Sequence, residues 1–404
     1  MPNNSDDSIP ISNPNKLTAD SIPAERVSLG ATGDYKPCVA KLPGGDLLLS
    51  AYRTAPALHG WEGAVYHDWN ESSPQRRYLE TTLLFKSGDG GKSWSESRLL
   101  NVAGKEAYLS VTDKGTLLMT AHVIEQNVIN EVGHCYGVLH RSPDQGQSWY
   151  TIKAQPRSAN PARYHYYDLT TRNVLKLNDG SLMFIASGVG PDAHTVFRST
   201  DDGFQWNWQY EARITGQPEA YSYSAFGEGV LWQARSGKLF CILRVDCREW
   251  PDVEGKPLEI SKDELSDNFD RLILFSSIDE GRSWQPEREF GDYGQMYPAI
   301  LRLQDGRLLL TFTQRAVKPP LGLRAVIGTE HDDGFEFDLQ RDVFMIDAKT
   351  PEGLASGGGF GCTVQLDDGT LVSSYSYRDH PDEFAGAYSG LHLETVRWRL
   401  PSGS

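Results

Sequence analysis

Cationic and polar side chains stand at one recurring place in this sequence, at the end of an apolar run that follows a glycine turn. Five such ends carry Arg53, His122, Arg244, Arg315 and Arg378. Arginine presents a planar fork of donors that matches a carboxylate, so a fold that brings these ends to one opening would form a pocket for an acidic ligand. A strand end is also polar simply because it meets water, and that alternative stays open for each residue taken alone.

Three further polar residues stand at the other end of the pattern, where the run before the glycine turn begins. They are Lys36, Glu228 and Tyr297. If the fold brings both kinds of strand end to one opening, these residues would line it together with the arginines. Because these residues are far apart in the chain, their use depends on the elements that position them.

An eight-residue phrase, S-x-D-x-G-x-x-W, occurs four times, beginning at Ser87, Ser142, Ser199 and Ser277, and a degenerate copy begins at Thr329. A phrase repeated at intervals of tens of residues indicates one supersecondary unit used many times. Ser and Asp side chains bond to nearby backbone groups and Gly supplies a positive φ, which is typical of a turn. We therefore interpret the phrase as structural and exclude its aspartates from the catalytic candidates.

A second pattern, in which two apolar runs flank a polar glycine turn, occurs six times. Each copy predicts a β-hairpin with a two-residue turn of the Asp-Gly type or a near relative. The turn glycines are Gly45, Gly115, Gly180, Gly237, Gly306 and Gly369. With four strands to a unit, six units fill the chain, so the sequence predicts an all-β fold of six four-stranded antiparallel sheets.

The sixth unit lacks the repeated phrase, and its strand at 391–400 is the last of the chain. Its fourth strand must come from elsewhere, and the remaining strand-like segment is ERVSLG at 25–30. We expect this N-terminal strand to close the ring, because an unpaired edge would expose backbone donors and acceptors. Residues 24–404 then form one domain, and the polar segment 1–23 is expected to be disordered.

Composition excludes several classes of function. The formal net charge of −15 argues against nucleic-acid binding, and no apolar run approaches the ~20 residues that cross a bilayer, so no membrane partner is expected. The N-terminus shows no secretory signal, so we expect a cytoplasmic protein, with the mature form of a secreted one as the alternative. Cys38, Cys241 and Cys362 stand within strand runs and are interpreted as buried small residues.

Strand order places the glycine turns and the repeated phrase on one face of the ring, so we expect a functional site on the other face. Two long insertions, 54–80 and 246–270, belong to the first and fourth units, which are opposite each other in a ring of six. These insertions could wall a central cleft. The connection 159–172 adds an aromatic and cationic cluster.

The repeated phrase resembles the Asp-box, or bacterial neuraminidase repeat, and the chain resembles the sialidase superfamily of six-bladed β-propellers. FGEGVLWQARSGKLFCILR is similar to the sialidase stretch with a Glu before one strand and an Arg after the next, here Glu228 and Arg244. YPAILRLQDG is similar to the phrase that carries the sialidase tyrosine nucleophile, here Tyr297. The resemblance implies that the Glu228 carboxylate takes the phenol proton of Tyr297, so that the oxygen can attack an anomeric carbon.

The arginines that bind the substrate carboxylate in sialidases match less well. Where the family has Y-R-I-P, this chain has Lys36 in place of the arginine, without a bidentate fork. Phe269 occupies the place of the third family arginine, with Arg271 two residues later. Arg315 and Arg378 are further candidates for that role.

The resemblance also implies a general acid from the first insertion. Asp68, beside His67, and Glu80, at its end, are the two candidates. A raised pKa in a semi-enclosed cleft would let the chosen carboxyl group protonate a leaving oxygen. Either acid is also typical of a solvated loop.

Three classes of function remain open. The first is a sialidase-like exo-glycosidase that hydrolyses a terminal acidic or modified sugar with retention. The second is another propeller carbohydrate enzyme, either a two-carboxylate glycosidase or a uronate lyase with His122, His165 or Tyr167 as base. The third is a non-catalytic glycan-binding propeller. A glycan or glycoside is the expected partner, and no cofactor or metal is expected, because no EF-hand-like array of aspartates is present.

Overall fold

The computed structural model describes residues 8–12, 21–56, 65–67, 77–102, 105–124, 137–154, 167–187, 194–216, 221–224, 226–247, 270–289, 294–315, 321–331, 334–337, 343–354, 356–360, 362–381 and 390–401. Within these ranges the regular structure is β-strand, apart from one 3-10 turn, η2 (Phe226–Glu228). The fold is therefore all-β, as the alternation of apolar runs and turns predicts.

Six successive antiparallel units of four strands make up the sheets. Unit 1 contains β4 (Asp34–Lys41), β5 (Leu47–Pro56), β7 (Arg77–Ser87) and β8 (Arg98–Leu100). Unit 2 contains β9 (Lys105–Val111), β10 (Leu117–Ile124), β11 (Gly137–Ser142) and β12 (Tyr150–Ala154). Unit 3 contains β14 (Leu175–Lys176), β15 (Leu182–Ser187), β16 (His194–Ser199) and β17 (Asn207–Ile214).

The remaining units follow the same order. Unit 4 contains β19 (Val230–Gln233), β20 (Leu239–Cys247), β21 (Arg271–Ser277) and β22 (Ser283–Glu289). Unit 5 contains β23 (Gln295–Arg302), β24 (Leu308–Gln314), β25 (Gly322–His331) and β26 (Gly334–Phe337). Unit 6 contains β28 (Thr363–Gln365), β29 (Leu371–Arg378), β30 (Leu391–Trp398) and β3 (Ala24–Leu29).

Short strands connect or extend these units. They are β1 (Ile11–Ser12), β2 (Ser21–Ile22), β6 (Val65–His67), β13 (Tyr167–Thr170), β18 (Tyr221–Ser224) and β27 (Val343–Met345). Strand β13 pairs with both β10 and β15, and β17 pairs in parallel with β22, so units 2, 3 and 4 join at their edges into one 14-stranded sheet.

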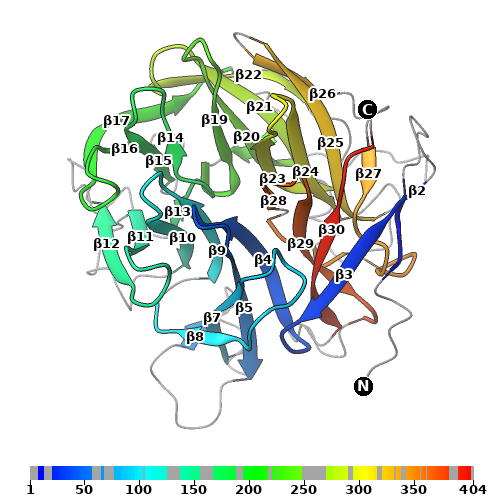
Figure 1. The fold of residues 1–404 in the computed structure, drawn as a ribbon. Coiled ribbons are helices and arrows are strands. Elements are labelled where there is room, and N and C mark those ends of the chain that lie inside the picture. Colours follow the sequence, from blue (N-terminus) through cyan, green and yellow to red (C-terminus); the bar gives the residue numbers. More distant parts are fainter. Residues whose placement is uncertain are drawn as a thin grey trace.

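The first strands of units 1, 2, 5 and 6 lie near a common centre. Figure 1 shows β4, β9, β23 and β28 around the middle of the molecule, with later strands of the same units farther out. Strand β4 contacts both β9 and β28, and β23 contacts both β19 and β28. Residues far apart in the chain therefore meet where these inner strands begin and end.

Every unit opens with the same hairpin. In the first, the Leu42 N–H donates to the Asp46 carbonyl at 2.9 Å and the Gly45 N–H donates to the Leu42 carbonyl at 2.9 Å. The other five hairpins repeat both bonds, and their glycines have φ between 80° and 94°. The connection contains three residues rather than the two that the sequence predicted, because a glycine in the left-handed region follows the tight turn.

The S-x-D-x-G-x-x-W phrase forms the same turn in all four copies. The serine hydroxyl donates to the aspartate at 2.7–2.8 Å and accepts from the glycine N–H at 2.7–3.0 Å. In the last three copies the tryptophan N–H donates to the carbonyl of that glycine at 2.9–3.1 Å. Each aspartate is thus bonded within its own turn, in agreement with the structural interpretation.

The N-terminal segment pairs with the end of the chain. Strand β3 runs antiparallel to β30 over its whole length, from Ala24 opposite Trp398 onward, where the sequence predicts a closing strand. Arg26 and Glu394 of this pair form an ion pair of 2.8 Å with both side chains fully buried. The prediction that 1–23 is disordered does not hold for β1 and β2, because β1 pairs with β2 and with β27.

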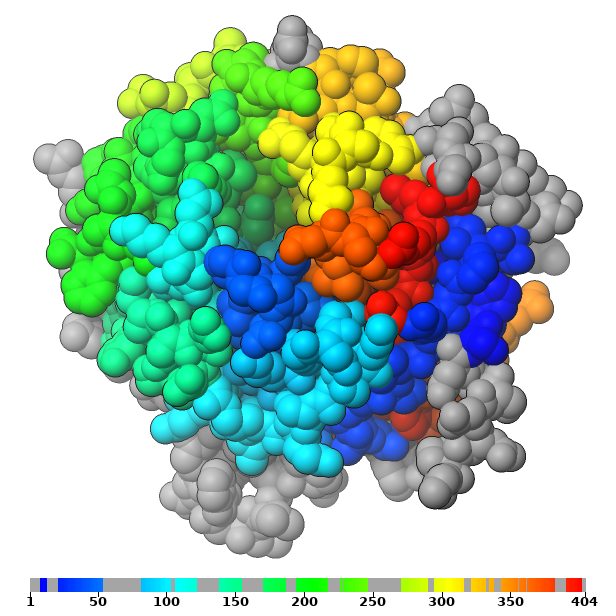
Figure 2. Space-filling view, viewed as in Figure 1, coloured from blue at the N-terminus to red at the C-terminus, as the bar shows by residue number. Residues whose placement is uncertain are grey.

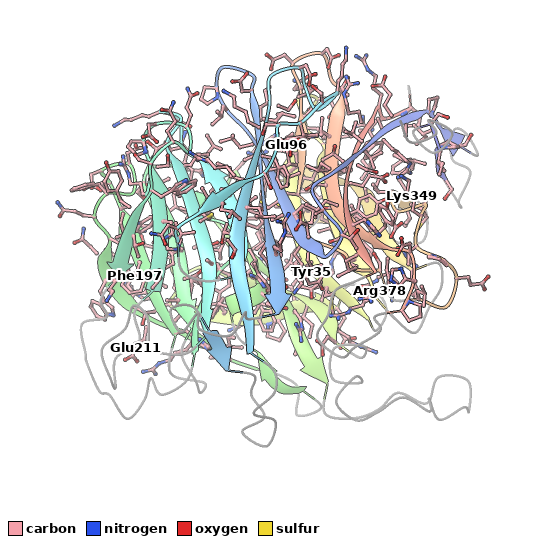
Figure 3. The ribbon with its side chains drawn as sticks, turned by 90° about the horizontal axis from the view of Figure 1, so that it is seen from below. Tyr35, Glu96, Phe197, Glu211, Lys349 and Arg378 are labelled. Carbon is pink, nitrogen blue, oxygen red and sulfur yellow. The ribbon has the colours of Figure 1, made fainter. Side chains whose placement is uncertain are left out.

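The strand ends that carry the hairpin turns and the repeated phrase lie on one side of the molecule, and the other strand ends lie on the opposite side. Figure 3 shows Tyr35 and Arg378 in one half and Glu96, which follows the first repeated phrase, in the other. Figure 2 shows a hollow at the centre of one face, where segments from several units meet. Cys38, Cys241 and Cys362 are buried, as predicted. Among the described residues, no helix has the length and apolar character that spanning a bilayer requires.

The second repeated turn carries a testable dependence on pH. Burial of the Asp144 carboxyl opposes its ionisation, but hydrogen bonds from Ser148 and Ser142 prevail and lower its pKa to about 2. A group with a lowered pKa stabilises the fold above its unfolded pKa and loses that effect as the pH falls toward the folded value. We expect Asp144→Asn to lower the free energy of unfolding by about 1 kcal/mol near neutral pH and by less near pH 3.

Denaturant unfolding at the two pH values measures this effect. Asp113→Asn is the matched control, because Asp113 is 72% exposed and pairs with a half-exposed lysine. An equal loss of stability at both pH values would contradict the assigned role of the Asp144 carboxylate.

Candidate functional site

Three inner strands carry the same irregularity near their beginnings. Lys36 in β4, Glu106 in β9 and Tyr297 in β23 adopt φ values of 47°, 58° and 55°, in the left-handed region that residues with a side chain rarely occupy. At each place two residues of the inner strand lie opposite one residue of its partner, which is a β-bulge. Bulges re-aim side chains, and strained backbone of this kind costs about 1–3 kcal/mol per residue and persists where surrounding contacts hold it.

The re-aimed side chains from units 1 and 2 join a buried ion pair. Lys36 Nζ binds Glu106 Oε1, and Arg172 Nη2 binds Glu106 Oε2 at 2.8 Å. The side chains of Lys36, Glu106 and Arg172 are 7%, 8% and 2% exposed. Charges so far from water are stable only when paired, and Glu106 is the counter-ion that both cations share.

The network continues into unit 4. Arg172 Nη2 also lies 3.3 Å from Glu228 Oε1, and Arg244 Nη1 binds Glu228 Oε2 at 2.7 Å. Arg244 Nε in turn binds Asp270. The structure thus brings Glu228 and Arg244 into direct contact, as expected for two residues on one hairpin. We call the connected set the axial charge network, which comprises Lys36, Glu106, Arg172, Glu228, Arg244 and Asp270.

Glu228 is the most accessible carboxylate of this network, with 18% of its side chain exposed. Partial burial opposes its ionisation, but Arg244 and Arg172 outweigh that effect and lower the pKa of Glu228. Its two oxygens each face a guanidinium group. Glu228 is therefore ionised at neutral pH. We call the place where the inner strands begin, at Lys36, Glu106, Glu228 and Tyr297, the inner opening.

Tyr297 lies beside the same network. Lys36 Nζ lies 4.5 Å from the centre of the Tyr297 ring, and Arg315 Nη1 lies 3.4 Å from its hydroxyl oxygen. The side chain is almost fully buried. Burial raises the pKa of Tyr297, although the charges of Lys36 and Arg315 act in the opposite direction. Lys36 is connected to Glu228 through Glu106 and Arg172, which pair in turn.

Phe360, which precedes β28 of unit 6, packs against these groups. Its ring lies 4.1 Å from the Arg172 guanidinium and 5.6 Å from the Tyr297 ring, edge to face. On its other side it lies 6.4 Å from Tyr108, which lines a separate cavity of about 540 Å³. Phe360 therefore lies between the axial charge network and that cavity.

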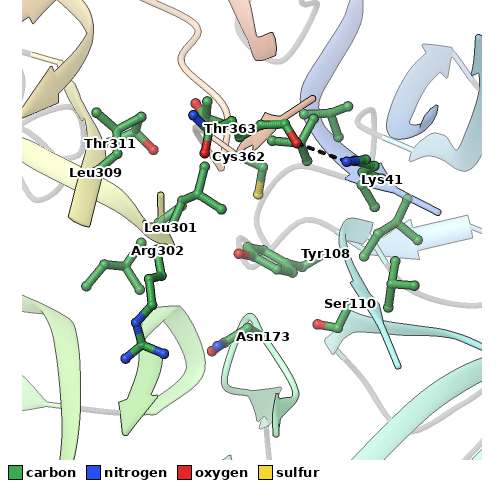
Figure 4. Close-up of a pocket in the computed structure, with 18 of the residues that line it drawn as sticks. Lys41, Tyr108, Ser110, Asn173, Leu301, Arg302, Leu309, Thr311, Cys362 and Thr363 are labelled. Atoms are coloured by element: carbon green, nitrogen blue, oxygen red, sulfur yellow. Dashed lines mark hydrogen bonds between the residues drawn. The ribbon is translucent and has the colours of Figure 1, made fainter. Parts of the chain in front are cut away.

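The cavity itself is a weaker candidate for a site. Figure 4 shows polar side chains around it, among them Asn173 and Lys41. The Asn173 amide is bonded to the backbone of Leu231 at 2.7 and 2.8 Å, and Lys41 binds Asp367. Because these groups are committed to the cavity wall, we place the candidate functional site at the axial charge network.

Sequence reasoning missed Glu106, Arg172, Asp270 and Phe360. A positional signal exists for two of them: Glu106 and Phe360 each stand nine residues before a hairpin glycine, as do Lys36, Glu228 and Tyr297. Because all six hairpins share one turn geometry, equal spacing along the chain places these residues at equivalent points of their units.

Two predicted substrate-binding arginines are paired outside the axial charge network. Arg53 binds Asp34 through two bonds of 2.6 and 2.9 Å, and Asp34 is fully buried. Arg271 binds Glu289 of the next strand. The backbone N–H of Arg378 donates to Thr350 at 3.2 Å.

The remaining predicted residues lie outside what the structure describes. Asp68 and His165 are in undescribed ranges, and of Glu80, His122 and Tyr167 only the backbone is described. The general acid therefore remains a prediction. Among the described residues, no group of three His, Cys, Asp or Glu side chains is placed to hold a metal ion.

Solved structures with the same fold include proteins that act on sugars. A protein of unknown function from Dyadobacter fermentans DSM 18053 matches with a TM-score of 0.62 and 19% identity, over 93% of this chain and 98% of that one. The NanB sialidase from Streptococcus pneumoniae matches with 0.58 and 14%, over 97% and 71%. An alpha-L-arabinofuranosidase from Fusarium graminearum, solved with an iminosugar inhibitor, matches with 0.56 and 11%, over 98% of both chains.

At these identities the similarity shows the fold alone. Comparison of the sequence with protein-family models and with curated proteins finds no match. The chain therefore has a sialidase-like β-propeller fold, and its function must be argued from its own residues.

The stability of the axial charge network can be tested at Arg172. We expect Arg172→Met to lower the free energy of unfolding by about 3–5 kcal/mol, because it leaves Glu106 buried with one of its two cations gone. Adding Glu106→Gln to this variant should lower the stability further, because the buried Lys36 then loses its counter-ion. Denaturant unfolding of both variants and of Lys176→Met measures the effect, since Lys176 forms an exposed ion pair whose loss costs about 1 kcal/mol or less. Equal effects of Arg172→Met and Lys176→Met would contradict the buried pairing.

Proposed function

We propose that the protein is a retaining exo-glycosidase that removes a terminal acidic or modified sugar from a glycan or glycoside. The observation that carries the proposal is the axial charge network with Tyr297 beside it: Arg244 binds Glu228 at 2.7 Å, and Lys36 lies 4.5 Å from the centre of the Tyr297 ring. A carboxylate, a guanidinium group and a phenol in this arrangement can transfer a proton and stabilise charge at one reacting carbon.

The six units form six blades of one propeller in this proposal, closed by β3. Six hairpins with the same two turn bonds support the count, and the pairing of β3 with β30 supports the closure. The axis of such a ring is where a sugar would reach residues from several blades at once.

In the proposed reaction the Tyr297 oxygen attacks the anomeric carbon while the bond to the leaving oxygen breaks. Glu228 accepts the phenol proton, and a general acid, for which Asp68 and Glu80 are the candidates, protonates the leaving oxygen. Lys36 and Arg315 stabilise the negative charge that develops on the phenol, because both act to lower its pKa. In the second step the deprotonated general acid takes a proton from water, and the water oxygen attacks the anomeric carbon from the face opposite Tyr297. The bond to the tyrosine oxygen breaks, Tyr297 takes its proton back from Glu228, and the two inversions give overall retention.

The named structural neighbours support this reaction class. Two of them are a sialidase and an arabinofuranosidase, and each has the same fold over more than nine tenths of this chain. Both names describe enzymes that cleave glycosidic bonds, so a glycoside is the first class of substrate to examine.

A second candidate is a two-carboxylate glycosidase in which Glu228 itself is the nucleophile. The specific observation is that both oxygens of Glu228 face guanidinium groups, which lower its pKa and keep it ionised. An ionised carboxylate is the state that a nucleophile requires, whereas a proton acceptor for Tyr297 must bind a proton more readily.

Covalent trapping decides between the two nucleophiles. The protein is incubated with fluorinated glycosyl fluorides, including a 2,3-difluoro sialic acid and neutral 2-fluoro sugars, and the labelled peptide is located by mass spectrometry. A sugar on Tyr297 supports the first mechanism, and a sugar on Glu228 supports the second. In the first case we expect Tyr297→Phe and Glu228→Gln each to lower kcat on an aryl glycoside about a hundredfold or more.

The controls separate the remaining classes of function. Thermal unfolding of each variant is measured beside its activity, so that misfolding is excluded. Glu394→Gln is the reference for a folding defect, because Glu394 forms a fully buried ion pair with Arg26 outside the axial charge network. An unsaturated product that absorbs in the ultraviolet would show a lyase instead. Glycan binding without turnover, unchanged in Tyr297→Phe, would overturn the proposal in favour of a non-catalytic propeller.

A further inference from the structure

The residue at the place of the expected carboxylate-binding arginine is already bound to a carboxylate of this chain. Lys36 Nζ pairs with Glu106 Oε1, and the bulge in each strand turns both residues into the left-handed region. Glu106 is held from its other side by Arg172 at 2.8 Å. One internal carboxylate thus occupies the space between two cations from units 1 and 3.

Burial protects the ion pairs of Glu106 from screening. Lys36, Glu106 and Arg172 are each less than a tenth exposed, so the pairs are little screened by water or salt. A carboxylate on a ligand could approach Lys36 or Arg172 only beside the Glu106 carboxylate. The ligand carboxylate and the Glu106 carboxylate would lie side by side in a site with little water and would repel each other. Only one of them could keep its pairing with the cation.

The cations nearer the opening are also neutralised. Arg244 binds both Glu228 and Asp270, and Arg53 binds Asp34 through two bonds. Asp34 and Asp270 are fully buried, and Glu228 is the one of these three carboxylates with an exposed part. Arg53 and Arg244 therefore present paired charges, which suit hydroxyl groups that both donate and accept hydrogen bonds.

We propose that Glu106 is a specificity-determining residue that selects an uncharged sugar at the inner opening. This inference rests on the proposed glycosidase function and narrows its substrate class: the terminal sugar carries hydroxyl or other uncharged substituents and no carboxylate. Glu106 acts as the internal counter-ion that a substrate carboxylate would otherwise supply.

The test uses matched sugars that differ at one carbon. Galactose is compared with galacturonic acid, glucose with glucuronic acid, and a didehydro sialic acid is added as a second carboxylated probe. Binding to wild-type protein and to Glu106→Gln is measured by calorimetry, and turnover is measured on the nitrophenyl glycosides of the same pairs. We expect wild type to prefer the uncharged member, and Glu106→Gln to bind the carboxylated member about tenfold more tightly than wild type does.

Two variants control for net charge and shape. Asp367→Asn changes the net charge equally at a side chain that is 91% exposed and pairs with Lys41, so it should leave the preference unchanged. The double variant Lys36→Met with Glu106→Gln leaves Arg172 as the one cation released from Glu106, so it should bind the carboxylated member less tightly than Glu106→Gln alone does. If Glu106→Gln gains no affinity for carboxylated sugars while it unfolds at the wild-type temperature, the proposal is overturned.

The wild-type measurements decide the matter even when Glu106→Gln does not fold. Preference of wild type for the carboxylated member, in binding or in turnover, overturns the role of Glu106 but leaves a glycosidase in place. If wild type binds the uncharged member but turns over no glycoside, the role of Glu106 in recognition is supported and the proposed hydrolysis is overturned. No binding of any sugar to either protein overturns both.

Discussion

A glycine turn with two backbone hydrogen bonds holds each inner strand in register, and the arrangement of the centre follows from it. In every unit the same turn fixes how far the strand reaches from hairpin to opening. The ninth residue before the glycine therefore reaches an equivalent point each time, and Lys36, Glu106, Glu228, Tyr297 and Phe360 are brought together by one repeated local geometry. A sheet alone would not do this, because its side chains alternate between faces with no preference for its end.

Burying the charged side chains of this centre costs free energy, and opposite charges from neighbouring units offset that cost. Glu106 lies between Lys36 and Arg172, and Glu228 between Arg172 and Arg244, so each carboxylate faces two cations. Replacing such a network by apolar residues is often neutral for stability. The charge network and the three left-handed residues at the strand beginnings are therefore better explained by a function than by a gain in stability.

Local patterns predicted the hairpins and the repeated turn, because each depends on residues close in sequence. The resemblance singled out Glu228 and Arg244 on one hairpin, and the two side chains lie in contact. The turn length was predicted wrongly, since a tight turn followed by a left-handed glycine has the same composition as a two-residue turn. Glu106 and Arg172 were missed because their partners lie in other units, where pairing depends on how sheets pack. Strands β1 and β2 were missed because two residues carry no periodicity.

The pairing of β3 with β30 has a consequence for how the chain is made. The sheet of unit 6 takes one strand from residues 24–29 and three from residues 363–398, with Ala24 opposite Trp398. While the chain is being made, β3 has no partner in that sheet, and Arg26 has no Glu394 to neutralise it, until the segment that contains β30 follows. This sheet is therefore completed only after the units between have been made, and the nascent chain must keep β3 from pairing elsewhere until then.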